Sequence, residues 1–389
     1  LYPHGSGAEL ATWLYSKLLA ERGIQVTIIT GQLANEPVRE ILGDRRVILR
    51  VPLRLFSGSR YDSFLNIGAI MGKSVRRLVA TSDVVYVPAG WYSAIPFAKM
   101  SRKPVIVHMH NYMLACPTSL MWSFDREQIG PSSYRSFILH EFLEKKRRAP
   151  VVLASSLLNV LLGKYVARLG RFADALIFVS NAQKRLFISR VPDLKSRSYV
   201  VYNPIPNDPL IKAEGKGIGY FGGISLVKGF HTLVKALKSL GNRGSFKVYM
   251  TKTVAHKRVM RLGDGSVVLL PKLDQERFLS IMKKISIAVV PSLWPEPSPY
   301  ALVRSMLYGK LIVASSIGGI PEITQGADKG VILVKPGDVE GIADALLSLL
   351  TLELEESNDI GAKNRDFVYQ KFDNDRTTRL FIDILDKIT

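Results

Sequence analysis

The sequence predicts an α/β protein made of two doubly wound domains, each with a mainly parallel sheet covered by helices. Its 389 residues are more than a single core usually serves. Short apolar runs alternate with amphipathic segments along nearly the whole chain, which is the pattern of strand and helix around a parallel sheet. A stretch with three prolines in seven residues, 203–209, interrupts the alternation near the midpoint and indicates a linker between domains.

In the first half, the expected strands and helices follow one another in regular order. The strands are apolar runs at 26–30, 84–87, 105–108 and 175–179, and the helices lie around 8–22, 62–80, 92–100 and 181–190. Residues 1–9 have the composition of a strand-to-helix loop, but no strand stands in front of them. Because a parallel sheet rarely opens in this way, we expect that a strand of about five residues precedes residue 1 in the native protein.

A second alternation begins after the linker. Its expected strands are 218–221, 247–250, 267–270, 288–290, 311–314 and 331–334, and its expected helices lie near 229–240, 252–262, 274–284, 299–308 and 339–350. We expect the last helix, about 375–388, to return to the first domain. The predicted division is therefore 1–205, 206–374 and a terminal helical segment, 375–389.

Charge and cysteine content limit the possible partners. Net charge is +20, and residues 1–205 hold 28 Lys and Arg against 13 Asp and Glu. The first half thus faces something acidic, either anionic lipid, a phosphorylated acceptor or nucleic acid, and charge alone does not separate these. The one cysteine, Cys116, excludes an internal disulfide and a multi-cysteine metal site. Its neighbours supply no activating base, so we interpret it as a packing residue.

The chain has no expected membrane span or targeting segment. Its longest apolar stretch, 150–163, is shorter than the roughly 20 residues that a spanning helix needs. The first residues lack the basic and then apolar layout of a signal peptide. A cytoplasmic location is therefore expected.

The segment 291–322 carries most of the functional information. Glu296 stands just before an expected helix, for which Pro299 suits the first position and Gly309 the end. The apolar stripe of this helix is formed by Leu302, Val303, Met306 and Leu307. We expect the free N–H groups at its start, those of Tyr300, Ala301 and Leu302, to face outward beside Glu296. Such a helix start binds anions and the carboxylate binds hydroxyls, a combination that suits a nucleotide sugar.

These motifs resemble those of a known family. Pro295-Glu296-Pro297, a helix, Gly309-Lys310, an apolar strand and Gly318-Gly319-Ile320-Pro321-Glu322 resemble the donor-binding segment of retaining glycosyltransferases of family 4, which have the GT-B fold. Tyr220 to Gly223 with Lys228-Gly229 resembles the family's phosphate loop, 334–338 its late strand-to-helix turn, and 108–117 its N-domain histidine segment. The matches span nearly the whole chain in order.

The resemblance implies an architecture and a reaction. Two Rossmann-like domains would face each other across a cleft, with the acceptor held by 1–205 and the nucleotide sugar by 206–374. The family moves a hexose or N-acetylhexosamine from a UDP- or GDP-sugar to an acceptor hydroxyl with retained anomeric configuration, and it needs no metal or other cofactor. The implied acceptor is a lipid-linked or cell-surface glycan, reached from the inner face of the membrane by a peripheral protein.

The same resemblance assigns roles to residues of this sequence. Glu296 would contact the transferred sugar, Lys228 would neutralise the diphosphate, and His110 would lie near the sugar; these are the three catalytic candidates. The remaining donor-binding candidates are Gly5, Ser6, Gly7, Gly222, Gly223, Ser298, Tyr300, Ala301, Leu302 and Arg304. Purely structural alternatives stay open, namely a tight turn at Gly5 to Gly7, an exposed lysine, a helix-capping glutamate and a buried core histidine.

Three positions depart from the family pattern. The expected arginine after the first phosphate-loop glycine is Gly223, the second glutamate of the Glu-x7-Glu pair is Arg304, and the acid that often follows the histidine is Asn111. We hypothesise that Arg304 reaches the phosphates or ribose of the donor. The alternative is that Arg304 points to solvent or pairs with an unrelated acid.

A basic cluster, Lys145, Lys146, Arg147 and Arg148, precedes the apolar stretch 151–163 and further basic residues at 164, 168 and 171. This pattern favours contact with an anionic membrane surface, and an ordinary buried helix with a solvated end is the alternative. Two other functions compete with an enzyme. A non-catalytic GT-B protein would bind nucleotide sugar or lipid without transfer, and a nucleic-acid binder ranks last because no recognised binding module is present.

Overall fold

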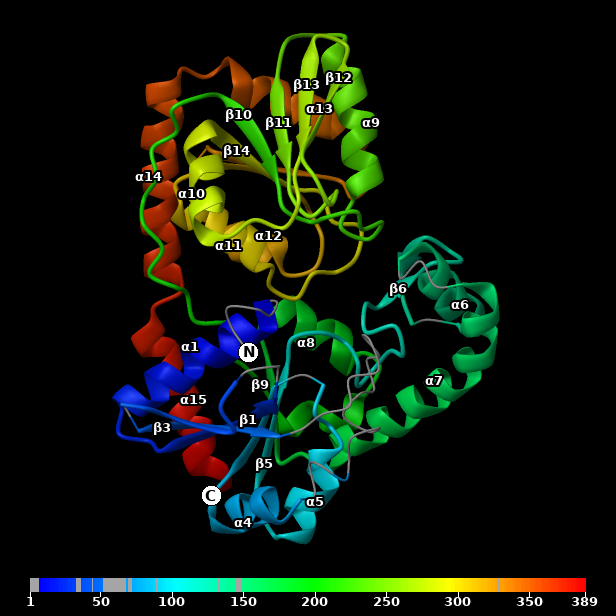
Figure 1. The fold of residues 1–389 in the computed structure, drawn as a ribbon, viewed down its shortest axis with the longest axis vertical. Coiled ribbons are helices and arrows are strands. Elements are labelled where there is room, and N and C mark those ends of the chain that lie inside the picture. The colour runs from blue at the N-terminus through cyan, green and yellow to red at the C-terminus, as the bar shows by residue number, and fades with distance from the viewer. Residues whose placement is uncertain are drawn as a thin grey trace. The chain divides into compact units, whose positions relative to one another are not determined.

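The computed structural model describes residues 7–32, 36–43, 45–51, 68, 72–88, 90–131, 133–144, 148–327 and 329–389. The chain divides into two compact units, one made of Leu1–Phe142, Arg147–Ile205 and Phe372–Thr389, the other of Leu143–Lys146 and Pro206–Lys371. Each unit contains a largely parallel sheet with helices packed on it (Figure 1). The predicted α/β fold class is confirmed.

The first unit holds a four-stranded parallel sheet in the order β4-β5-β8-β9 and a three-stranded sheet in the order β1-β3-β2, where β2 is antiparallel. The strands are β1 (Val26–Gly31), β2 (Arg39–Leu42), β3 (Arg46–Val51), β4 (Val85–Pro88), β5 (Val105–Met109), β8 (Ala175–Phe178) and β9 (Ser198–Val200), with a small pair, β6 (Trp122–Ser123) and β7 (Gln128–Ile129). The helices are α1 (Gly7–Glu21), α4 (Lys73–Thr81), α5 (Ala94–Met100), α6 (Tyr134–Leu143), α7 (Ala149–Leu169), α8 (Asn181–Ile188) and α15 (Asn374–Ile388).

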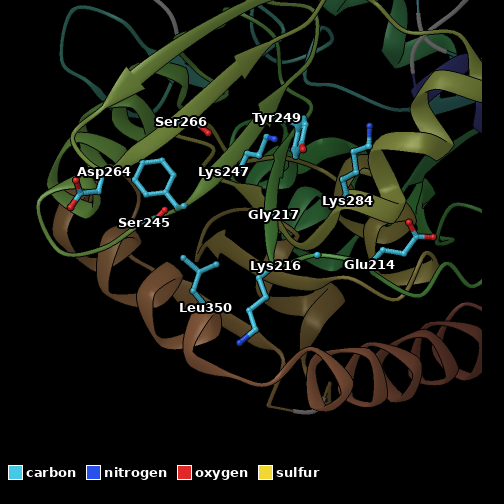
Figure 2. Close-up of a pocket in the computed structure, with 12 residues that line it drawn as sticks. Glu214, Lys216, Gly217, Ser245, Lys247, Tyr249, Asp264, Ser266, Lys284 and Leu350 are labelled. Atoms are coloured by element: carbon cyan, nitrogen blue, oxygen red, sulfur yellow. The ribbon is translucent and has the colours of Figure 1, made fainter.

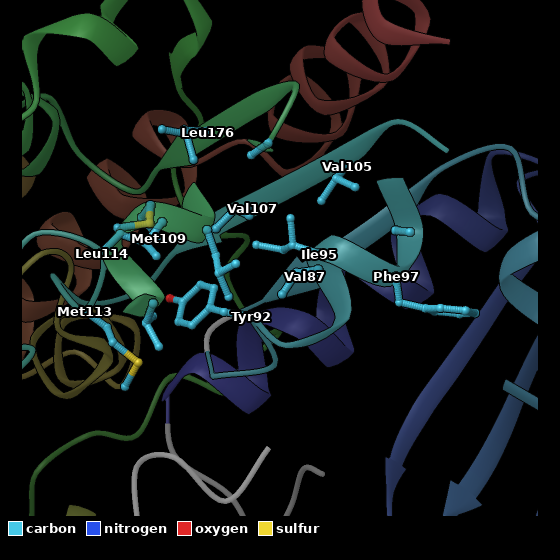
Figure 3. Close-up of a cluster of buried hydrophobic side chains, with 14 of the residues drawn as sticks. Val87, Tyr92, Ile95, Phe97, Val105, Val107, Met109, Met113, Leu114 and Leu176 are labelled. Atoms are coloured by element: carbon cyan, nitrogen blue, oxygen red, sulfur yellow. The ribbon is translucent and has the colours of Figure 1, made fainter. Parts of the chain in front are cut away.

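Strand β5 shows why this unit has two cores. All five of its residues are buried, and successive side chains point to opposite faces of the sheet. Val105, Val107 and Met109 pack on one side, with Ile95 of α5 (Figure 3). Ile106 packs on the other side, in a cluster with α1 and α15. The strand therefore delivers His108 to the second face and ends just before His110.

The second unit is built on a seven-stranded sheet in the order β12-β13-β11-β10-β14-β15-β16, parallel except for β12. The strands are β10 (Gly217–Tyr220), β11 (Lys247–Met250), β12 (Arg258–Leu262), β13 (Gly265–Leu269), β14 (Ile285–Val290), β15 (Leu311–Ser315) and β16 (Val331–Val334). The helices are α9 (Phe230–Gly241), α10 (Gln275–Lys284), α11 (Tyr300–Leu307), α12 (Ile320–Thr324), α13 (Val339–Thr351) and α14 (Leu354–Lys371). Leu237 of α9 and Leu346 of α13 share one core with the sheet, and Met282 of α10 shares the other.

One predicted element is wrong. Residues 252–262 do not form a helix; a loop leads into β12, which pairs antiparallel with β13. Gly263 and Asp264 make the two-residue turn of this hairpin, because Leu262 lies opposite Gly265, and Gly263 has φ +58°. The apolar and polar residues of this segment alternate too weakly to separate strand from helix, so the turn decides the outcome.

Candidate functional site

Two loops meet at the carboxyl edge of the second unit's sheet. Strands β10 and β14 are parallel neighbours, so the loops that follow them, 221–229 and 291–299, leave the same edge. The N–H of Leu293 donates to the carbonyl of Val227 at 2.8 Å. Gly229 has φ +76°, and a Cβ there would overlap the carbonyl oxygen of Pro291. Only glycine allows the two loops to approach this closely.

This contact brings two of the predicted catalytic residues together. The ammonium group of Lys228 donates to Oε1 of Glu296 at 2.5 Å, and the hydroxyl of Ser292 donates to the same oxygen at 2.8 Å. Glu296 is only 3% exposed, whereas the Lys228 side chain is 38% exposed. Within the described part of the chain, Oε2 of Glu296 accepts no hydrogen bond. The arrangement is a buried carboxylate with one oxygen held and the other available.

The backbone of Glu296 is fixed from a third direction. The N–H of Gly319 donates to the carbonyl of Glu296 at 2.7 Å. Gly318 has φ +60°, and a Cβ there would overlap the backbone of residues 295 and 296. The Gly-Gly turn after β15 therefore clamps the Pro-Glu-Pro segment. Helix capping does not explain Glu296, since its carboxylate bonds to Lys228 and Ser292 instead of the N–H groups of α11.

The helix start differs from the expectation in two details. Helix α11 begins at Tyr300, and Pro299 is its N-cap, with φ −75° and ψ 112°. The N–H of Leu302 donates to the carbonyl of Pro299 at 3.0 Å, so it does not face outward as predicted. The Leu302 side chain is also fully buried, while Ala301 is exposed and Ser298 and Tyr300 are partly buried. The N–H groups of Tyr300 and Ala301 remain candidates for donor binding.

The phosphate loop is a tight turn. The N–H of Lys228 donates to the hydroxyl of Ser225 at 3.2 Å, and that of Gly229 to the carbonyl of Leu226 at 2.9 Å. Gly223 is buried and has φ +68°, which an arginine with its Cβ would adopt only under strain. The glycine at this position therefore suits the left-handed backbone conformation that it adopts here.

Arg304 has a partner that the sequence did not identify. Its guanidinium makes two bonds to the carboxylate of Asp208, from Nε at 2.6 Å and from Nη2 at 2.9 Å, and a third bond joins Nη2 to the hydroxyl of Tyr308 at 2.7 Å. The Tyr308 hydroxyl also donates to Asp208, at 3.0 Å. The structure thus corresponds to the alternative, in which Arg304 pairs with an unrelated acid. We do not retain Arg304 as a donor-binding residue.

In the first unit, His108 and His110 stack with ring centroids 4.4 Å apart. His108 is fully buried, and its Nδ1 lies 2.7 Å from the hydroxyl of Tyr86. Burial lowers the pKa of His110 to about 4, although Glu9 opposes the shift, so the ring is neutral at pH 7. Nε2 of His110 is buried and has no hydrogen-bond partner among the described residues. Nε2 of His108 is likewise buried without a partner among the described residues, so the two rings differ in the bond of His108 to Tyr86.

Other candidates are only partly covered. Gly7 is the first residue of α1, while Gly5 and Ser6 lie outside the described residues, as do Lys145, Lys146 and Arg147. Arg148 is exposed and is the N-cap of α7. Cys116 is buried beside the hydroxyl of Thr118, at 3.1 Å, as a packing residue would be.

Among the residues that the structure describes, no group of three or more His, Cys, Asp or Glu is placed to hold a metal ion. An Asp-x-Asp sequence can bind a divalent cation through its carboxylates, and this chain has one, Asp373-Asn374-Asp375. Here it begins α15, and Asp373 caps the helix by accepting from the N–H of Arg376 at 2.8 Å. None of the described helices is both long and apolar enough to cross a bilayer.

A pocket of about 580 Å³ lies elsewhere in the second unit (Figure 2). Gly217, Lys247, Ser266 and Lys284 line it, at the amino ends of β10, β11 and β13 and just before β14. Because Lys228 and Glu296 follow the carboxyl ends of β10 and β14, this pocket is at the opposite edge of the sheet. It is not part of the candidate site.

Models of two glycosyltransferase families match the chain. The model for "Glycosyltransferase Family 4" matches residues 5–208, which is more than half of the chain, and the model for "Glycosyl transferases group 1" matches residues 215–352. The chain belongs to glycosyltransferase family 4. A protein in the cps region of Klebsiella pneumoniae, described as an uncharacterized 42.6 kDa protein, is 23% identical over 339 residues, 83% of this chain and 85% of that one. N-acetyl-alpha-D-glucosaminyl L-malate synthase from Bacillus anthracis is 35% identical over 75 residues, 19% of each chain.

Solved structures show the same GT-B fold. HepE from Anabaena, solved with UDP and glucose, is 17% identical with a TM-score of 0.65, over 98% of this chain and 96% of that one. Sucrose-phosphate synthase from Thermosynechococcus elongatus is 14% identical with a TM-score of 0.68, over 98% and 94%. This glycosyltransferase therefore has the two Rossmann-like sheets that its sequence predicts.

Proposed function

We propose that this family 4 glycosyltransferase moves a hexose or N-acetylhexosamine from a UDP- or GDP-sugar to an acceptor hydroxyl and retains the anomeric configuration. One observation carries the proposal: a buried carboxylate, Glu296, is held by Lys228 at the edge of a parallel sheet beside the start of α11. This juxtaposition offers a cation and backbone N–H groups to a diphosphate and a carboxylate oxygen to a sugar hydroxyl.

In the proposed reaction, the bond between the anomeric carbon and the diphosphate oxygen breaks, and a bond from that carbon to the acceptor oxygen forms. Lys228 and the N–H groups of Tyr300 and Ala301 stabilise the negative charge that develops on the leaving diphosphate. Oε2 of Glu296 orients the sugar by accepting from a hydroxyl. The departing phosphate takes the acceptor proton, so the reaction needs no further side chain as base.

We assign the second sugar contact to His110. Its low pKa keeps the ring neutral near pH 7, so Nε2 either donates or accepts one hydrogen bond without adding charge. A buried ring nitrogen without a partner loses the hydrogen bonds that it makes in water. A sugar hydroxyl at Nε2 would restore one of them, which explains why the nitrogen is left unused.

Support for the donor class comes from the relatives. HepE from Anabaena has been solved with UDP-glucose, and trehalose-6-phosphate from E. coli, as that structure is described, with UDP-2-fluoro glucose. The Bacillus anthracis relative is named for N-acetylglucosaminyl transfer to malate.

We also propose that the first unit contacts an anionic membrane surface. Leu157, Leu161 and Tyr165 follow one face of α7 at intervals of four residues and are 61%, 53% and 47% exposed. Arg148 lies at one end of the helix, and Lys164 and Arg168 lie near the other. Apolar side chains between basic ones suit a lipid headgroup layer, where a lipid-linked acceptor and a peripheral enzyme would meet.

The experiment that tests the main proposal is a mass-spectrometric assay of sugar release from UDP- and GDP-sugars. Slow hydrolysis of one donor, abolished by Glu296→Gln, supports an enzyme with this site. Binding of a nucleotide sugar with no turnover, in the presence of lipid-linked and free glycan acceptors, supports a non-catalytic protein instead. Two departures from the family, at Gly223 and Arg304, make that rival worth testing.

A further inference from the structure

Lys228 alone supplies too little positive charge to balance a bound diphosphate. Lys228 and Glu296 are in direct contact, so their charges largely cancel, and Gly223 contributes no side-chain charge. A nucleoside diphosphate carries at least two negative charges at pH 7. If the protein binds such a donor, as proposed above, additional positive charge has to come from another element.

Lys252 is placed to supply it. Strand β11 is the parallel neighbour of β10 on the side away from β14, so the loop after β11 leaves the same carboxyl edge. A Cβ on Gly223 would lie 3.3 Å from the carbonyl oxygen of Lys252 and 3.5 Å from its Cβ. Lys252, two residues after β11, therefore lies beside Gly223, the position where the family carries its arginine.

The backbone of Lys252 is held in an uncommon conformation. Its φ is +60°, in the left-handed region that non-glycine residues seldom occupy. Neighbouring hydrogen bonds impose it: the N–H of Lys252 donates to the carbonyl of Pro271 at 3.3 Å, and that of Thr251 to the carbonyl of Tyr220 at 3.0 Å. Backbone strain of this kind clusters at functional sites, where the surrounding structure holds the residue in place.

Three lysines converge at this edge. Lys228, Lys252 and Lys272 follow β10, β11 and β13, three adjacent parallel strands. Partial burial, followed by the charges of Lys272 and Lys228, lowers the pKa of Lys252. Neither Lys252 nor Lys272 is paired with an acid in the described part of the chain. Lys228 is paired with Glu296, so the net positive charge comes from Lys252 and Lys272, and it favours an anionic ligand.

We propose that Lys252, with Lys272 beside it, binds the diphosphate of the nucleotide-sugar donor and replaces the cation that Gly223 lacks. The side chain approaches the phosphates from the loop after β11 instead of from the phosphate loop itself. Lys228 then holds Glu296 in position and contributes a hydrogen bond to the diphosphate, while the net positive charge is supplied by Lys252 and Lys272.

The test uses Lys252→Gly and Lys252→Gln in the full chain, with UDP and GDP as probes in a calorimetric titration. Each variant loses one charged hydrogen bond. Its affinity for UDP or GDP, whichever the wild type binds, is therefore expected to fall about tenfold. Binding of UMP or GMP, which lack the second phosphate, should weaken less. Lys235→Gln is the matched control, because it removes one charge from an exposed face of α9 in the same unit.

Stability measurements separate this effect from misfolding. Glycine adopts φ +60° without strain, so Lys252→Gly should unfold at the same temperature as the wild type or at a higher one. Unchanged diphosphate affinity in both Lys252 variants, while Lys228→Ala weakens binding, would overturn the inference and leave the proposed function intact. An equal loss in Lys235→Gln would also overturn it. If the wild type binds neither UDP nor GDP, the proposed function itself fails first.

Discussion

The ammonium group of Lys228 lies 2.5 Å from Oε1 of Glu296, although 68 residues separate them in the sequence. The carboxylate is almost fully buried and the lysine is not. Removing the lysine therefore leaves a buried charge without its cation, whereas removing the carboxylate leaves a cation that water can solvate. The two substitutions should differ in their effects.

Glu296→Gln is expected to lower sugar transfer with little loss of stability. The amide has the same shape but no charge, and loss of a charged hydrogen bond worth about 1.5–3 kcal/mol corresponds to a roughly 10- to 150-fold slower reaction. Initial rates from mass spectrometry measure the effect, and circular dichroism confirms the fold. Glu276→Gln, on the first turn of α10, is the control. Equal turnover in the Glu296 variant and the control would exclude Glu296 from the site.

Lys228→Ala is expected to weaken nucleotide binding and turnover together, because the contact proposed between the lysine and the diphosphate exists both before and during the reaction. It should also destabilise the second unit by about 1–3 kcal/mol, since Glu296 loses its cation. Urea unfolding of Lys228→Ala, Glu296→Gln and the double variant measures the coupling. The double variant should recover stability but not activity. Additive losses of stability would show that the contact contributes nothing.

Arg304→Glu is expected to destabilise the protein, because it places a second carboxylate beside Asp208. We expect a loss of about 1–3 kcal/mol in the free energy of unfolding. The charge-swapped pair, Arg304→Asp with Asp208→Arg, should restore part of it. Nucleotide affinity at a temperature where all variants are folded should not change. Weaker nucleotide binding in both variants would instead return Arg304 to the donor site.

Replacement of Lys145, Lys146, Arg147 and Arg148 by Gln is expected to weaken binding to anionic vesicles and leave donor binding unchanged. Each basic residue near an anionic surface contributes about 1 kcal/mol. Leu157→Ser with Leu161→Ser should weaken the same binding through the apolar face of α7. Co-sedimentation with phosphatidylserine vesicles is the measurement, and phosphatidylcholine vesicles are the control. If the wild type does not sediment at low salt, membrane contact is ruled out.

The contribution of Lys310 to stability is expected to rise with pH between about 8 and 10.5. Lys310 is fully buried, and its ammonium group donates to the carbonyl of Ile211 at 2.7 Å. Burial lowers the pKa of Lys310 to about 8, so the unfolded chain binds more protons in this window and deprotonation favours the folded state. The gain is about 3 kcal/mol on full deprotonation. Urea unfolding at several pH values measures it, and in Lys310→Met this pH dependence should disappear.

The sequence was sufficient for the features that local patterns encode. Glu296 and Lys228 were found because each stands in a short motif of proline or glycine next to an expected helix. Ser292 was missed, although its place directly after a buried strand, at the edge where ligands bind, was a usable signal. The same reasoning applies to Lys252, which follows β11 by two residues. Its left-handed backbone conformation, by contrast, depends on hydrogen bonds to other loops and has no local signature.

Other differences between prediction and structure arise where a local sequence pattern does not decide the structure. Asp208 stands 96 residues before Arg304, and a contact over that distance is set by tertiary packing instead of sequence pattern. The hairpin of β12 was mistaken for a helix because Val259 and Met260 suit either period, and only the Gly-Asp turn distinguishes them. The short edge strands β2 and β9 were also missed, since they are three or four residues long and only partly buried.

The absence of a side chain at Gly229 has a consequence for redesign of this enzyme. Because its backbone packs directly against Pro291, the two loops that carry Lys228 and Glu296 are held at a fixed distance from each other. The loop after β11 takes no part in this contact, so exchanges in that loop are expected to leave the spacing of the two charges unchanged. Any residue larger than glycine at 229 would push the two loops apart and change the distance between Lys228 and Glu296.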